Sequence, residues 1–122
     1  MRPHQKLDLW TRAIEFVLAI YKLTERFPTE EKFGLTSQMR RASVSIAANI
    51  SEGAARTSVK EFMQFLSHSQ GSASEVDTEL IIAARLGYVL DEEYQKLSRD
   101  LDDIGRMITR LSQSLKRRAT LL

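Results

Sequence analysis

Hydrophobic residues recur along most of this chain in alternating steps of three and four positions, which is the spacing of one face of an α-helix. Short polar segments separate four stretches with this period, and we predict helices over about residues 6–26, 35–54, 58–86 and 91–116. Because the connections are short, we expect the helices to run up and down as an antiparallel four-helix bundle. The pattern predicts an all-α fold with a single domain over residues 1–122.

The first predicted helix is apolar over more of its circumference than one core face requires. One seam contains Trp10, Ile14, Val17, Tyr21 and Thr24, and a second contains Leu9, Ala13, Phe16, Ile20, Leu23 and Phe27. A lone bundle needs only one broad apolar face, so the surplus predicts a hydrophobic surface between subunits. We expect this surface to include some of Leu9, Phe16, Leu18, Ile20 and Leu23.

The second and third predicted helices both contain stretches of small side chains. Residues 40–56 hold five alanines and one glycine, and residues 69–74 read SQGSAS. A glycine in the middle of a helix costs about 1 kcal/mol relative to alanine, so Gly71 suggests a close contact. We expect the two stretches to face each other, with the helix backbones closer together than leucine would allow.

Asn49 is not explained by packing of small residues. It lies on or beside the apolar face between Ile46 and Ile50, where a buried amide needs hydrogen-bond partners. We interpret it as a structural amide that fixes the register of packing. Glu52 and Arg56 are four residues apart, a spacing that favours a surface ion pair over a catalytic acid.

The fourth predicted helix is sharply divided in charge. Residues 91–103 hold six acids and two bases, whereas residues 104–122 hold five bases and no acid. Such a division complements the helix dipole. Repetition of the basic patch in an oligomer would also create a zone that attracts phosphate backbones. The candidate nucleic-acid-binding residues are Arg106, Arg110, Lys116, Arg117 and Arg118.

Composition narrows the class of protein. A chain without cysteine has neither a disulfide framework nor a thiolate metal site, which fits an intracellular location. The N-terminus lacks the pattern of a secretory signal, and the longest apolar stretch, residues 16–21, is too short to cross a membrane. We therefore expect a cytoplasmic protein without membrane contact, and the net charge of +2 alone does not identify a partner.

An enzyme is the competing interpretation, and the sequence argues against its usual helical-bundle forms. Di-iron bundles need Glu-x-x-His repeats, and neither His4 nor His68 lies in one. HEPN-type ribonucleases place a histidine a few residues after an arginine, but Arg56 and His68 are too far apart. We therefore predict no catalytic residue, no metal site and no cofactor.

Two motifs resemble a known family. The string FGLTSQMRRASVSIAANISEG covers residues 33–53, and EFMQFLSHSQGSASEVDTEL covers residues 61–80. Together with Leu9-Trp10 and Phe27-Pro28, they resemble the S23 ribosomal proteins, which are encoded in intervening sequences of large-subunit ribosomal RNA genes. The positions that match the family motif, which we interpret as structural, are Arg40, Arg41, Ser45, Asn49, Glu52, Gly53, Gly71, Ser72 and Glu75.

The resemblance implies an up-down bundle that assembles into a ring-like homopentamer without established enzymatic activity. The accessory protein of diversity-generating retroelements is similar to this family, and it is a basic pentamer that binds nucleic acid and a reverse transcriptase. Fold similarity alone does not transfer function. The resemblance therefore favours an oligomeric protein that binds RNA or DNA, with a protein scaffold or accessory subunit as the alternative.

Overall fold

The structure is a computed structural model that describes the backbone of residues 1–121 and the side chains of residues 1–120. It contains two short 3-10 helices, η1 (Pro3–Lys6) and η2 (Thr29–Glu31). The four α-helices are α1 (Asp8–Thr24), α2 (Leu35–Ala54), α3 (Val59–Arg85) and α4 (Asp91–Leu121). The prediction of an all-α fold with four helices is confirmed, and α4 continues past the predicted end at residue 116.

Local sequence explains where α3 begins and ends. The Ser58 hydroxyl accepts a hydrogen bond from the backbone N–H of Glu61 at 3.0 Å, which caps the first turn. At the other end, Gly87 has a φ of +84° and its N–H donates to the Ala84 carbonyl at 3.0 Å. Glycine adopts this left-handed conformation without steric cost, so the helix ends here.

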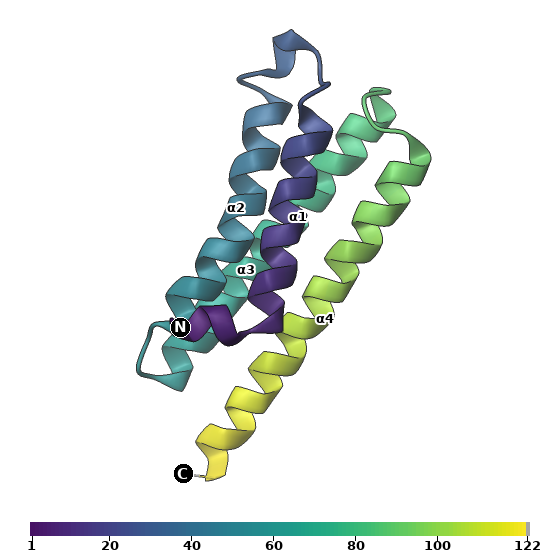
Figure 1. The fold of residues 1–122 in the computed structure, drawn as a ribbon. Coiled ribbons are helices and arrows are strands. Elements are labelled where there is room, and N and C mark those ends of the chain that lie inside the picture. Colours follow the sequence, from purple (N-terminus) through teal and green to yellow (C-terminus); the bar gives the residue numbers. More distant parts are fainter. Residues whose placement is uncertain (122) are drawn as a thin grey trace.

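Successive helices run in opposite directions, and the α1–α2 and α3–α4 connections lie at the same end of the bundle (Figure 1). Arg26 at the end of α1 accordingly pairs with Glu93 at the start of α4. Among the four helices, α2 and α3 share the most extensive contact, whereas α1 and α4 share a much smaller one. The C-terminal turns of α4 extend past the other helices at the opposite end of the bundle (Figure 1).

One cluster of apolar side chains from all four α-helices forms the core. Apolar residues that recur every three or four positions along α3 and α4 supply much of it. The largest fully buried apolar side chains are Ile20, Met39, Ile46, Ile50, Leu66, Val76, Leu80, Ile104 and Ile108. Within the described residues, no helix combines the length and the apolar content that a membrane crossing requires.

The structure corrects the prediction of which α1 residues face another subunit. Four of the five candidates are at most 6% exposed, because they pack into the core of the chain itself: Leu9, Phe16, Ile20 and Leu23. Leu18, the fifth candidate, lies on the surface with 64% of its area exposed. Of the two apolar seams, the one that begins at Trp10 and includes Ile14 and Val17 is only half-buried.

The close contact between α2 and α3 centres on Gly53 instead of Gly71. A Cβ atom at Gly53 would lie 2.9 Å from Cδ1 of Phe62, so a larger residue would push the helices apart. Ser69 is fully buried in the same interface, and its hydroxyl donates to the Ile46 carbonyl at 2.9 Å. Gly71 is exposed and a Cβ there would meet nothing within 4 Å, so the predicted contact at this glycine is wrong.

Candidate functional site

The five basic residues predicted to contact nucleic acid are all exposed on α4. Their register follows from helix geometry, in which each residue turns the side-chain direction by about 100°. Arg106, Arg110 and Arg117 fall within about 40° of one another, so they form a row along the helix. This row faces away from the buried residues Ile108 and Leu115, while Lys116 and Arg118 lie on its two flanks.

The first residue of the row belongs to an ion-pair network. The Arg106 guanidinium pairs with the Asp103 carboxylate, which also accepts a hydrogen bond from Arg12 of α1 at 3.1 Å. The hydrogen bond from Arg12 is the main cause that lowers the pKa of Asp103, and the hydrogen bond from Arg106 adds to it. The network attaches the middle of α4 to α1 and neutralises part of the Arg106 charge.

The remaining bases of the patch form no ion pair with the side chains of residues 1–120: they are Arg110, Lys116, Arg117 and Arg118. No acidic residue occurs in residues 104–122. The patch begins in the middle of α4 and continues into its C-terminal turns, which extend past the other helices (Figure 1). These charges are therefore available to an anionic partner.

Arg40 of the family motif joins α2 to the end of α1. Its Nε donates to the Thr24 hydroxyl at 2.9 Å, and its Nη2 donates to the Tyr21 carbonyl at 3.3 Å. The guanidinium carbon also lies 4.6 Å from the centre of the Tyr21 ring. Because the carbonyls of the last helical turn have no partner within the helix, Arg40 ties α2 to the C-terminal end of α1.

Most of the other motif residues meet along the outer groove between α2 and α3. The Ser45 and Ser72 hydroxyls share a hydrogen bond of 2.8 Å, which joins the two helices. Asn49 is half-buried, and its amide donates to the Ser45 carbonyl at 2.8 Å and to the Ser45 hydroxyl at 3.0 Å. Arg41 and Glu75 line a polar hollow of about 470 Å³ above this network. The motif thus organises one face of the bundle.

Glu52 and Arg56 do not form the predicted ion pair among the described side chains. Arg56 instead lies 4.0 Å from the Glu61 carboxylate and 4.7 Å from the centre of the Phe65 ring. His68 meets the same ring edge-on at 6.0 Å between centroids. The reason is that the chain turns after residue 54, so Arg56 is no longer on the helical face of Glu52.

Glu79 of α3 was missed by the sequence analysis. It is only 5% exposed, and its Oε1 atom is buried without a hydrogen-bond partner in the described residues. Burial is the main cause that raises its pKa to about 7, and the nearby Glu75 carboxylate adds to the shift. Its position three residues after Val76 and four before Ala83, both of the apolar seam, is the signal that could have located it.

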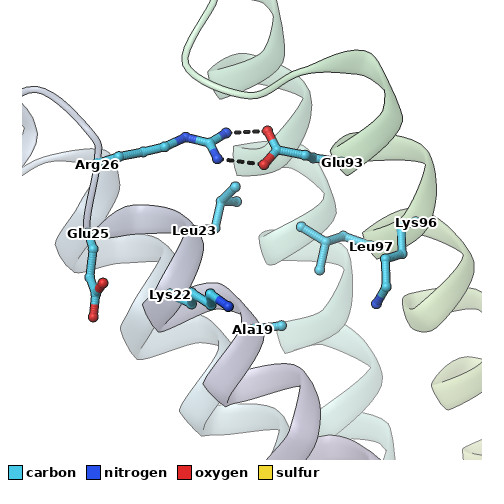
Figure 2. Close-up of a pocket in the computed structure, with 8 residues that line it drawn as sticks. All are labelled: Ala19, Lys22, Leu23, Glu25, Arg26, Glu93, Lys96 and Leu97. Carbon is cyan, nitrogen blue, oxygen red and sulfur yellow. Dashed lines mark hydrogen bonds and ion pairs between the residues drawn. The ribbon is translucent and has the colours of Figure 1, made fainter.

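The small contact between α1 and α4 leaves a groove beside the Arg26–Glu93 pair (Figure 2). This hollow of about 580 Å³ has an apolar floor that includes Ala19, Leu23 and Leu97, and charged residues form its rim. The hydrogen bond from Arg26 is the main cause that lowers the pKa of Glu93, which keeps the carboxylate charged. The rim carries both signs of charge and does not select an anionic partner.

The described residues contain no group of three histidine, cysteine or acidic side chains placed to hold a metal ion. The two histidines lie in separate aromatic contacts, with His4 meeting the Trp10 ring at 5.0 Å between centroids and His68 beside Phe65. Among the described side chains, the basic part of α4 is where several exposed bases lie without an acidic partner.

Comparisons with known proteins agree with the fold. The family model described as 23S rRNA-intervening sequence protein matches residues 5–110. No curated protein matches the chain. A crystal structure of a protein with unknown function, from the S23 ribosomal protein family of Bacteroides thetaiotaomicron VPI-5482, has a TM-score of 0.76 to this structure. It shares 24% sequence identity, and the alignment covers 85% of this chain and 97% of that chain, which shows a common fold.

Proposed function

Because the chain belongs to the 23S rRNA-intervening sequence protein family, we propose that it is a non-enzymatic protein that binds RNA through the basic end of α4. The family membership confirms the resemblance found in the motifs of α2 and α3. The relation to the accessory protein of diversity-generating retroelements stays a prediction. An RNA partner is also consistent with the predicted cytoplasmic location.

The observation that carries the proposal is the uncompensated charge on α4. Residues 104–122 contain five bases and no acid, although the whole chain has a net charge of only +2. Arginine and lysine side chains that contact phosphates release the counterions condensed on a nucleic acid, and this release drives binding. We therefore expect binding that weakens steeply with salt and depends little on nucleotide sequence.

We also propose that the protein self-associates, as the homopentamer that the family resemblance implies. The support in the structure is an apolar hollow of about 250 Å³ between the outer faces of α1 and α2. Ile14 and Val17 line it together with Val44, which is 42% exposed. Leu18 on α1 adds a further exposed apolar side chain. Burial of this face between subunits would remove it from water and repeat the basic patch around the assembly.

Light scattering coupled to size exclusion tests the self-association. We expect a mass several times that of the 13.9 kDa chain, and Val44→Glu should shift the protein towards monomer. Leu90→Glu is the matched control, because Leu90 is 64% exposed but lies in the α3–α4 connection. A parent protein that stays monomeric at micromolar concentration contradicts the proposal.

Fluorescence anisotropy with labelled RNA and DNA at several salt concentrations tests the RNA-binding function. In the test variant, glutamine replaces Arg106, Arg110, Lys116, Arg117 and Arg118. In the control variant, glutamine replaces three exposed bases: Lys22 near the end of α1, Lys32 in the α1–α2 connection and Arg85 at the end of α3. These parts of the chain lie at the other end of the bundle from the C-terminus of α4 (Figure 1). We expect the test variant alone to lose binding and salt dependence.

Equal binding by the parent and the test variant, with the same salt slope, would show that α4 is not the binding surface. A parent that binds neither RNA nor DNA at low salt would instead favour the protein-scaffold role. In that case, the apolar α1–α2 face is the surface that fits a protein partner, because its lining is almost entirely apolar.

A further inference from the structure

The shape and chemistry of the basic row indicate which form of RNA it fits. This inference rests on the proposed RNA-binding function. From Arg106 to Arg117 the row extends over eleven residues, or about 16 Å along a straight helix. Its members lie opposite the apolar seam, so they follow one edge of a continuous helix. Charges at fixed positions along a helix are suited to a polyanion whose phosphates are already held in place.

The surroundings of the row lack the aromatic platforms that hold single strands. No phenylalanine, tyrosine or tryptophan occurs in residues 95–122. On the neighbouring α3, the Phe65 ring is covered by Arg56 and met by His68. The exposed rings of Tyr21 and Phe33 belong to the last turn of α1 and to the α1–α2 connection, which lies at the other end of the bundle from the C-terminus of α4 (Figure 1). Single-strand-binding proteins gain about 1–3 kcal/mol per base by stacking on such rings, and this surface offers none.

Neutral polar side chains flank the row on the side of α3. Gln70 of α3 donates to the Gly105 carbonyl at 3.3 Å and to the Thr109 hydroxyl at 3.2 Å, which fixes the two helices side by side. Thr109 and Gln113 are exposed beside the row. Amide and hydroxyl groups of this kind can donate to and accept from a ribose 2′-hydroxyl. In A-form RNA these hydroxyls lie along the shallow minor groove, next to the phosphates.

We propose that the partner is double-helical RNA, with the row on the phosphates and the Thr109 and Gln113 side chains at the ribose 2′-hydroxyls. Base pairing pre-orders the phosphates, so the duplex binds this surface without the entropy cost of ordering a flexible strand. The 2′-hydroxyl contacts distinguish duplex RNA from duplex DNA. No base edge is read, and sequence preference is weak.

The experiment compares a 20-base-pair RNA duplex, one of its single strands and the DNA duplex of the same sequence by fluorescence anisotropy between about 50 and 200 mM salt. We expect the parent to bind the RNA duplex at least about 10-fold more tightly than either competitor. The double variant Arg110→Gln/Arg117→Gln should lower the magnitude of the salt slope by about 2. Gln113→Ala should reduce the preference for RNA duplex over DNA duplex and leave the DNA affinity unchanged.

The control double variant, Lys32→Gln/Arg85→Gln, removes the same charge from the other end of the bundle and should bind like the parent. Single-stranded RNA bound through the same row as tightly as the duplex overturns the inference and leaves the proposed function standing. Equal affinity of the parent for RNA and DNA duplexes also overturns it. Absence of binding to every RNA at 50 mM salt overturns both the inference and the proposed function.

Discussion

The buried carboxyl group of Glu79 should make the stability of this protein fall as the pH rises from about 4.5 to about 7, and Glu79→Gln should remove that dependence. The side chain is 5% exposed, with one oxygen buried and unpaired in the described residues. Burial, with a smaller contribution from Glu75, raises its pKa from 4.5 to about 7. The folded protein therefore disfavours the charged form that the unfolded chain adopts freely.

The magnitude follows from the linkage between protonation and folding. Below pH 4.5 the carboxyl group is protonated in both states, and its ionisation costs no stability. The cost grows between pH 4.5 and about 7 and is constant above, at roughly 3 kcal/mol for this shift. Between pH 5 and pH 8 the loss amounts to about 2.5 kcal/mol. Glutamine does not ionise, and any cost of its buried amide, about 1–3 kcal/mol, is independent of pH.

Urea unfolding and thermal melts at pH 5, 6, 7 and 8 measure this difference, at one protein concentration because assembly also affects stability. From pH 5 to pH 8, Glu79→Gln should gain about 2.5 kcal/mol relative to the parent, or about 10 °C in Tm. Glu15→Gln, at an exposed glutamate of α1, is the control and should follow the parent. Parallel curves for Glu79→Gln and the parent would refute the assignment of a buried neutral carboxyl group.

Further measurements test the packing and the ion pairs. Gly53→Ala should destabilise the protein by about 1–3 kcal/mol because its Cβ would lie 2.9 Å from Phe62, whereas Gly71→Ala should stabilise it by up to about 1 kcal/mol. A higher Tm for Gly53→Ala than for Gly71→Ala in thermal melts would contradict this account. Arg40→Met should cost about 1–2 kcal/mol in urea unfolding, since the end of α1 loses two hydrogen bonds. The pKa of Asp103 is lower in the folded protein than its usual value of 3.8, so the ionised carboxylate stabilises the fold above pH 3.8. This stabilisation is lost as the pH falls through the folded pKa, and Asp103→Asn should therefore weaken the loss of stability at acid pH.

Several features of the fold follow from the sequence without knowledge of the tertiary structure. The repeat of apolar residues fixed the number of helices and the buried seams of α3 and α4, because a helix buries the residues that recur on one of its faces. Ser58 and Gly87 marked the ends of α3 through local hydrogen bonding and a positive φ. The basic row on α4 could also be predicted from the sequence, since its residues share a face in any straight helix.

Tertiary structure alone decided which surface of each helix meets a neighbour. Both apolar seams of α1 fit a core, and only the assembled bundle buries Phe16 while leaving Ile14 half-exposed. The cost of a glycine inside a helix pointed to Gly71 as the close contact, yet Gly53 faces α3 and Gly71 faces solvent. The buried, unpaired state of Glu79 likewise depends on what packs over it. Periodicity specifies the angles of side chains around one helix axis. Whether a side chain meets a neighbouring helix also depends on how each helix is rotated and shifted relative to the others, and the packing of all four helices determines that arrangement.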